Sequence, residues 1–205
     1  MVTIGGRKNG MIKKQRLVVV GNGMAPGRAL EHLFEAAPEA FEVTICNAEP
    51  RVNYDRIMLS PVLSGEKTYE EIVVHGDGWY VKHGVTLYKG ARVTAIDRSA
   101  KTVTAEFVSS DHGQAPLQPQ ITVGYDKLII ATGSSPIIIP VPGHDLAGVL
   151  SYRDLDDVNA MLLAAKSRGN AVVIGGGLLG LEAAAGLKEQ GMDVTVLHLM
   201  PTLME

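Results

Sequence analysis

Residues 171–187 read AVVIGGGLLGLEAAAGL, and this stretch decides the fold. Four apolar residues at 171–174 predict a buried strand, and an alanine- and leucine-rich helical run begins near Leu178. Gly175, Gly177 and Gly180 fill the G-x-G-x-x-G spacing between the two elements. There the first glycine permits a tight turn, the second lets a pyrophosphate approach the backbone, and the third lets helix and strand pack closely. The stretch therefore predicts a dinucleotide site; the alternative is a glycine-rich turn that binds no ligand.

Composition and charge narrow the class of protein. The chain has 205 residues, 46% of them apolar and 20% charged, and its net charge of −3 gives no reason to expect a nucleic-acid partner. No apolar run approaches the ~20 residues that cross a bilayer. The amino terminus lacks the apolar core of a secretory signal, and the single cysteine, Cys46, excludes an internal disulfide. We therefore expect a cytoplasmic protein without membrane contact, with a disordered lead-in over residues 1–14.

A second strand and glycine turn stand near the amino terminus. RLVVV at 16–20 runs into GNGMAPGR, in which Gly21 and Gly23 match the fingerprint but Pro26 holds the third glycine position. Proline is acceptable in a first helical turn, because its missing N–H has no intrahelical partner there. FEVTICNA at 41–48 closes a β-α-β unit, and Glu49 just beyond it can accept hydrogen bonds from adenosine ribose hydroxyls. The alternative is a solvated glutamate at a strand end.

The segment at 50–67 has no clean period and predicts a long, ordered loop. Arg56 within it suits a pyrophosphate or the edge of a reduced flavin, and an exposed loop arginine is an equally consistent interpretation. The six histidines show no recurrent ligand spacing, so we expect no metal site.

A block of short strands is expected to follow, forming a small β insertion before the apolar strand YDKLIIATG at 125–133. Ser151 and Asp154 predict a capping box for a helix that runs through about Lys166. The short strands are expected at 85–88, 92–97, 102–108 and 121–123, with a hairpin turn across 98–101.

Two fingerprints separated by a small β insertion and an ATG strand resemble the two-dinucleotide flavoproteins, the FAD-dependent pyridine-nucleotide reductases. The resemblance covers residues 16–205. GNGMAPGR, NYDRIMLS and DKLIIATGS resemble more narrowly the amino-terminal part of the large subunits of assimilatory NAD(P)H nitrite reductases, close to the rubredoxin-reductase group. The implied fold is α/β: a Rossmann-like FAD domain at 15–143 with a small β insertion, then an incomplete second Rossmann unit for NAD(P) at 144–205.

The same resemblance implies the residues that hold each cofactor. Those for FAD are Gly21, Gly23, Met24 and Ala25 at the pyrophosphate, Glu49 at the ribose, Arg56 toward the flavin, Val93 at the adenine side, and Ala131, Thr132 and Gly133 closing over it. Those for NAD(P)H are Gly175, Gly177, Leu178 and Gly180, with Glu182 near the nicotinamide. No side chain is implied as a catalytic acid or base, because hydride passes directly from nicotinamide C4 to flavin N5.

The expected function is an FAD-dependent oxidoreductase module that accepts hydride from NAD(P)H and passes electrons to the rest of a larger reductase or to a small redox protein. One cysteine excludes the disulfide-reductase branch and leaves no ligands for siroheme or iron–sulfur centres, so this chain alone cannot reduce nitrite. His198 stands near the position that selects NADH or NADPH, and it is neither the acidic residue that favours NADH nor the arginine that favours NADPH. The alternatives are a non-catalytic nucleotide-binding fragment and a rubredoxin or ferredoxin reductase.

The sequence ends at Glu205, one β-α-β unit into the expected second domain. The later G-D motif with which the family holds the FAD ribitol does not occur in these residues. We therefore expect an exposed parallel-sheet edge and an apolar helix face near residue 205. Self-association is one way of covering them.

Overall fold

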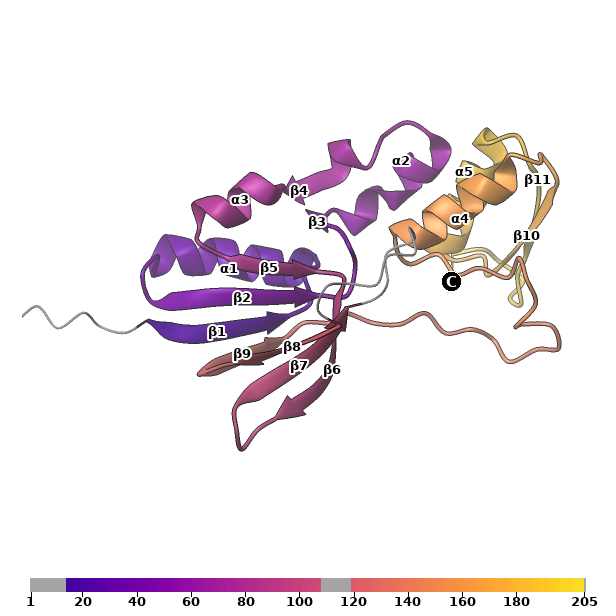
Figure 1. Ribbon diagram of the computed structural model, residues 1–205. Helices are drawn as coiled ribbons and strands as arrows, with labels where there is room; N and C mark the ends of the chain where they lie inside the picture. The colour runs from indigo at the N-terminus through magenta and orange to yellow at the C-terminus, as the bar shows by residue number, and fades with distance from the viewer. Residues whose placement is uncertain (1–13, 108–118, 205) are drawn as a thin grey trace, which may run out of the picture. The chain divides into compact units, whose positions relative to one another are not determined.

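The computed structural model describes residues 14–107 and 119–204, and contacts divide the chain into two compact units (Figure 1). Unit 1 comprises the described parts of Met1–Arg51 and Asp77–Ala131, and unit 2 those of Val52–Gly76 and Thr132–Glu205. The units therefore interleave along the chain, whereas the division expected at residue 143 is linear. The prediction that residue 143 separates an FAD-binding domain from an NAD(P)-binding domain stays a prediction. The lead-in lies outside the described residues except for Lys14.

Unit 1 is organised on a parallel sheet with the strand order β5-β2-β1-β9. Its strands are β1 (Gln15–Val20), β2 (Phe41–Asn47), β5 (Thr86–Lys89) and β9 (Lys127–Ile130). The helix α1 (Met24–Ala36) connects β1 to β2, and their register pairs Val20 with Cys46. Val18, Val19 and Ile45 are fully buried, as expected for central parallel strands that are covered on both faces.

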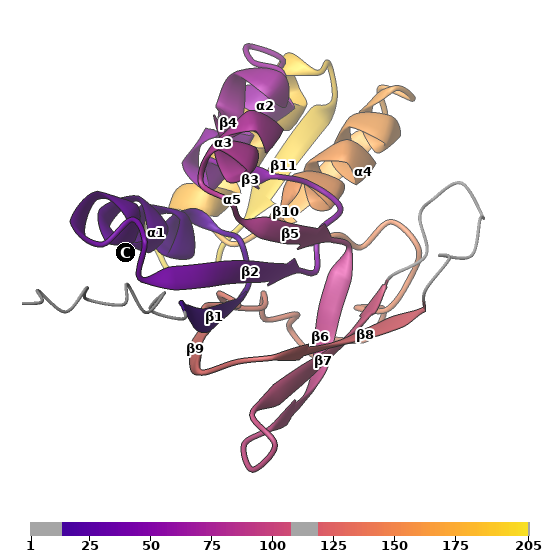
Figure 2. The same cartoon turned by 60° about the vertical axis from the view of Figure 1, so that its left-hand side comes forward.

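The small β insertion is an antiparallel sheet of three strands, β6 (Ala91–Asp97), β7 (Thr102–Phe107) and β8 (Gln120–Gly124). Val103 of β7 and Tyr125 pack with Val18 and Val20 of β1. The insertion and α1 lie on opposite sides of the parallel sheet in both views (Figures 1 and 2). The hairpin predicted from the sequence is confirmed.

Helix α3 (Asp77–Lys82) packs against α1 through aromatic rings. The ring of His83 stacks on Phe34 with centroids 4.6 Å apart, and the ring of Trp79 lies 5.6 Å from Phe34. The only tryptophan of the chain is therefore a packing residue of this unit, as the sequence suggested.

Cys46 is 1% exposed in β2, and its burial raises the pKa of the thiol to about 11 from an ordinary value of 9.0. Because only the thiolate reacts with alkylating agents, we expect the folded chain to resist iodoacetamide at pH 8. The labelling rate, followed by mass spectrometry, is expected to rise with urea in step with global unfolding. Rapid labelling of the folded chain would contradict this prediction.

Unit 2 contains a parallel pair of strands, β10 (Asn170–Ile174) and β11 (Asp193–Leu197), joined by α5 (Leu178–Glu189). Its core draws on Leu63, Val158 and Leu187. The other elements of the unit are β3 (Asn53–Tyr54), the 3-10 turn η1 (Arg56–Met58), α2 (Leu59–Ser64), η2 (Glu70–Ile72), β4 (Val73–His75) and α4 (Leu155–Ala165).

The prediction of a loop at 50–67 is wrong, because this segment forms β3, η1 and α2. Leu59, Val62 and Leu63 have helical spacing and are all buried. Six residues are too few for that period to stand out in a sequence, and Pro61 disguises the helix although it sits harmlessly in the first turn.

The capping box of α4 exists, but the predicted pair of residues was wrong. The N-cap is Asp154, whose side chain accepts from the backbone N–H groups of Asp156 and Asp157. Asp157 reaches back to the N–H of Asp154, at 3.3 Å, as the glutamate of a capping box would. Ser151 donates its hydroxyl to the Asp157 carboxylate and so supports the cap from outside.

The parallel strands of unit 2 expose apolar side chains on one face, whereas the sequence predicted a buried strand at 171–174 with an exposed sheet edge. Val172 and Ile174 of β10 are 65% and 59% exposed, and Leu197 of β11 is 58% exposed. The first turn of α5 adds Leu178 and Leu179, both more than half exposed. Within residues 14–107 and 119–204 no helix has the length and apolar character that would cross a bilayer.

Candidate functional site

The two glycine turns have the same backbone conformation. Gly21 and Gly175 adopt φ values of 102° and 120°, which side-chain-bearing residues rarely take. Two residues later Gly23 (φ −78°, ψ −170°) and Gly177 (φ −82°, ψ −178°) serve as N-caps of α1 and α5. The imperfect fingerprint of unit 1 and the complete one of unit 2 thus fold alike.

Each turn is anchored at the carboxyl end of its sheet. The N–H of Gly21 donates to the carbonyl of Cys46 and that of Gly175 to the carbonyl of Leu197, both at 2.9 Å. Neither N-cap has a side chain to satisfy the first-turn N–H groups, and no acidic residue stands in either first turn. The absence of a side-chain cap and the positive end of the helix dipole therefore favour an anion such as a pyrophosphate at each turn.

The three glycines of the fingerprint differ in what surrounds them. A Cβ built on Gly23 or Gly177 would meet no atom of the chain within 4 Å, so packing within the protein does not require glycine there. At Gly180 a Cβ would lie 2.0 Å from the Gly175 carbonyl oxygen, so close packing does require it. These surroundings fit a cradle for a pyrophosphate at the second glycine and helix–strand contact at the third.

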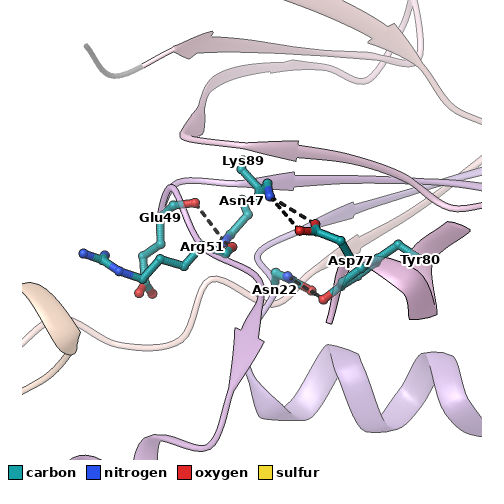
Figure 3. A network of polar contacts seen from close by, with 7 residues as sticks. All are labelled: Asn22, Asn47, Glu49, Arg51, Asp77, Tyr80 and Lys89. Carbon is teal, nitrogen blue, oxygen red and sulfur yellow. Dashed lines mark hydrogen bonds and ion pairs between the residues drawn. The ribbon is translucent and has the colours of Figure 1, made fainter. Parts of the chain in front are cut away.

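The unit 1 turn is held by side chains that the sequence pattern did not reveal (Figure 3). Asn22, inside the turn and 6% exposed, donates its Nδ2 to the hydroxyl of Tyr80 at 3.0 Å. Asn47, at the end of β2, donates to the backbone carbonyls of Glu49 and Arg51 at 3.0 and 2.9 Å. The Glu49 carbonyl also accepts the N–H of Gly90, at 3.0 Å. The backbone around Glu49 is therefore fixed while its side chain is half-buried.

The remaining residues predicted for FAD lie on several elements. Met24 and Ala25 form the exposed first turn of α1, and Val93 lies in β6 where the register with β7 shifts. Ala131 extends β9 by donating its N–H to the Val20 carbonyl at 2.8 Å. Ala131 belongs to unit 1, whereas the exposed Thr132 and Gly133 belong to unit 2. Gly21, Gly23, Met24, Ala25, Glu49 and Val93 are thus placed within unit 1.

Arg56 lies in unit 2, in the 3-10 turn before α2. Its Nη1 donates to the backbone carbonyl of Arg153 at 3.2 Å, and its guanidinium lies 5.2 Å from the centroid of the Tyr54 ring. Arg56 is therefore not the freely exposed loop arginine of the alternative interpretation. Its approach to a flavin stays a prediction.

Glu182 is held by a chain of hydroxyl groups within unit 2. The Ser60 hydroxyl donates to Oε2 of Glu182 at 2.7 Å and lies 2.9 Å from the hydroxyl of Tyr152. Burial raises the pKa of Tyr152, and the nearby Glu182 charge raises it further. Neither Ser60 nor Tyr152 was among the residues predicted from the sequence.

This arrangement depends on close packing of α2 on α5. A Cβ on Gly186 would lie 2.8 Å from Cγ of Leu63, so the glycine is required for the approach of the two helices. One turn further, Gln190 donates its Nε2 to the Leu63 carbonyl at 2.9 Å. Glu182, Gly186 and Gln190 are spaced by four residues and form one stripe along α5, and α2 covers that stripe.

His198 follows β11 and contacts the unit 2 turn. Its Nδ1 accepts the N–H of Gly176 at 3.0 Å, and its Nε2 is buried without a hydrogen-bond partner among the described residues. A neutral imidazole that accepts at Nδ1 carries its proton on Nε2. His198 therefore supports the turn through Nδ1, and its Nε2 is a buried donor beside it.

A β-α-β unit with a glycine turn and uncapped helix N-terminus occurs in each compact unit, and this fold and site define a Rossmann-type dinucleotide-binding protein. The family profile of the pyridine nucleotide-disulphide oxidoreductases matches residues 15–205. The chain belongs to this family, which confirms the α/β fold and the resemblance seen in the sequence.

Several proteins of this family are similar to the chain. A nitrite reductase [NAD(P)H] of Bacillus subtilis is 47% identical over 94% of this chain and 22% of its own length. An assimilatory nitrate reductase electron transfer subunit of the same organism is 45% identical over 95% of this chain and 24% of its own length. A NAD-dependent persulfide reductase from A. fulgidus superposes with a TM-score of 0.80 at 26% identity, over 92% of this chain and 34% of that one. The chain therefore spans about a quarter of the length of these curated relatives.

Proposed function

We propose that this chain is the FAD- and NAD(P)H-binding module of a nitrite reductase large subunit. The observation that carries the proposal is the repetition of one anion-binding turn at Gly21–Gly23 and Gly175–Gly177, each with open space at the second glycine. The 47% identity to a nitrite reductase [NAD(P)H] supports the choice of enzyme. When bound, the nicotinamide supplies hydride and the flavin accepts it.

In this proposal each unit binds one nucleotide. The first turn of α1 takes the FAD pyrophosphate, and Glu49, whose backbone Asn47 fixes, accepts from the ribose. The first turn of α5 takes the pyrophosphate of NAD(P)H, and the Nε2 donor of His198 lies beside that turn. The cytoplasm is the proposed location, and the rest of the reductase is the proposed electron acceptor.

The test is titration of the purified chain with FAD under anaerobic conditions, followed by addition of NADH. We expect a flavin spectrum to remain with the protein after desalting and NADH to bleach it. Trp79, the only tryptophan, lies beside Tyr80, which bonds Asn22 in the turn, so its fluorescence is expected to fall as FAD binds. A chain that takes up no FAD would overturn the proposal.

A second candidate is a flavoprotein that passes electrons to a separate redox protein. The similarity to an assimilatory nitrate reductase electron transfer subunit favours this alternative. The two candidates share both nucleotide sites and differ in the electron acceptor. Reduction of rubredoxin or ferredoxin by NADH in the presence of the flavin-loaded chain would favour the second.

A further inference from the structure

The hydroxyl chain that ends on Glu182 has a fixed direction. A carboxylate only accepts hydrogen bonds, so the Ser60 hydroxyl must donate its single proton to Oε2 of Glu182, at 2.7 Å. The hydroxyl of Tyr152, 2.9 Å from Ser60, must then donate to Ser60. The raised pKa of Tyr152 keeps this donor protonated across the physiological range. The chain therefore runs from Tyr152 through Ser60 to the carboxylate.

Resting on the proposed function, we propose that Ser60 and Tyr152 are positioning residues that hold the Glu182 carboxylate as the acceptor for the carboxamide N–H group of a nicotinamide ring. A carboxylate bonded on one oxygen retains lone pairs for an amide donor, whereas the phosphates of a dinucleotide carry no donor for it. Glu182 would then recognise the nicotinamide half of the ligand. The glycine turn would bind the pyrophosphate, which other dinucleotides also contain.

The packing around Glu182 supports a positioning role. Glu182 follows the N-cap Gly177 by five residues, so it stands just beyond the first turn that would hold the pyrophosphate. Its neighbours along the same stripe, Gly186 and Gln190, are both fixed against Leu63 of α2. The helix that carries Ser60 is thereby locked onto the helix that carries Glu182. A side chain held in this way loses little conformational freedom when it binds a ligand.

The test uses two ligands that differ only in the nicotinamide ring, NAD+ and ADP-ribose, measured by titration calorimetry on the 205-residue chain. Ser60→Ala and Tyr152→Phe are expected to weaken NAD+ binding by roughly 10-fold and to leave ADP-ribose within about 2-fold. Ser60→Thr retains the hydroxyl and is expected to restore the affinity for NAD+. Thermal unfolding of each variant shows whether it remains folded, and Tyr152→Phe preserves the packing of the ring if Ser60→Ala does not fold.

The matched control is Ser64→Ala in the same helix. Ser64 donates its hydroxyl to the Pro61 carbonyl at 3.1 Å, so its removal is expected to change neither affinity. If the Ser60 and Tyr152 variants lose affinity equally for both ligands, or for neither, the inference is overturned and the proposed function still stands. A wild-type chain that binds neither ligand would overturn the NAD(P)H part of the proposed function, and the inference with it.

Discussion

Replacement of Gly180 by alanine is expected to destabilise unit 2 by about 2 kcal/mol or more. The added Cβ would lie 2.0 Å from the carbonyl oxygen of Gly175, and a backbone atom in a tight turn cannot rotate away as a side chain can. Overpacking of this kind typically costs about 1–3 kcal/mol and occasionally more, whereas alanine in a helix interior gains at most about 1 kcal/mol over glycine. The steric cost therefore exceeds the gain in helix propensity.

Hydrogen exchange is the appropriate measurement, because it reports on each unit separately. Amides of β10 and α5 are expected to lose protection in Gly180→Ala, while those of β1 and β2 retain it. The control is Gly177→Ala in the same fingerprint, where a Cβ meets no atom within 4 Å. That control is expected to lose no more than the ~1 kcal/mol by which glycine exceeds alanine as an N-cap. Wild-type protection of α5 in Gly180→Ala would contradict this prediction.

The parts of the fold that the sequence predicted are those with short-range causes. The turn at 171–187 combines an apolar strand, three spaced glycines and an alanine-rich helix within one segment, and the structure confirms these elements and the turn. The expectation that the strand is buried was wrong, because Val172 and Ile174 are more than half exposed. The turn at Gly21 was predicted despite Pro26 because the first two glycines govern the turn, and Pro26 is buried in the first turn of α1. Such features need no knowledge of distant residues.

The features that the sequence did not reveal depend on distant contacts or on very short elements. Ser60 and Glu182 are separated by 122 residues, and no spacing rule brings them together. Asn22 stands at a variable position of the fingerprint, which carries no signal, yet Tyr80 fixes it from 58 residues away. The stripe of Glu182, Gly186 and Gln190 is readable in the sequence, but its partner α2 has only six residues. A glycine one turn after a glutamate in a helix is the signal that could have indicated a close helix partner.

The open space at Gly23 leads to the opposite expectation from that at Gly180. Because a Cβ at Gly23 meets nothing within 4 Å, Gly23→Ala is expected to fold, with at most the ~1 kcal/mol loss of an N-cap change. The methyl group would however stand where a pyrophosphate must approach the first-turn N–H groups of α1. FAD affinity is therefore expected to fall by at least about 100-fold, which corresponds to ~2.7 kcal/mol.

Flavin absorbance retained after desalting and the fluorescence of Trp79 during FAD titration measure this loss. Gly78→Ala is the matched control, because Gly78 also has open space for a Cβ and lies in unit 1 outside the turn. That control is expected to bind FAD as the wild type does, while both variants keep the unfolding temperature near that of the wild type. A Gly23→Ala chain that retains FAD would show that the pyrophosphate does not approach this turn. Replacement of a glycine that packing requires thus lowers stability, whereas replacement of a glycine that a ligand requires lowers affinity alone.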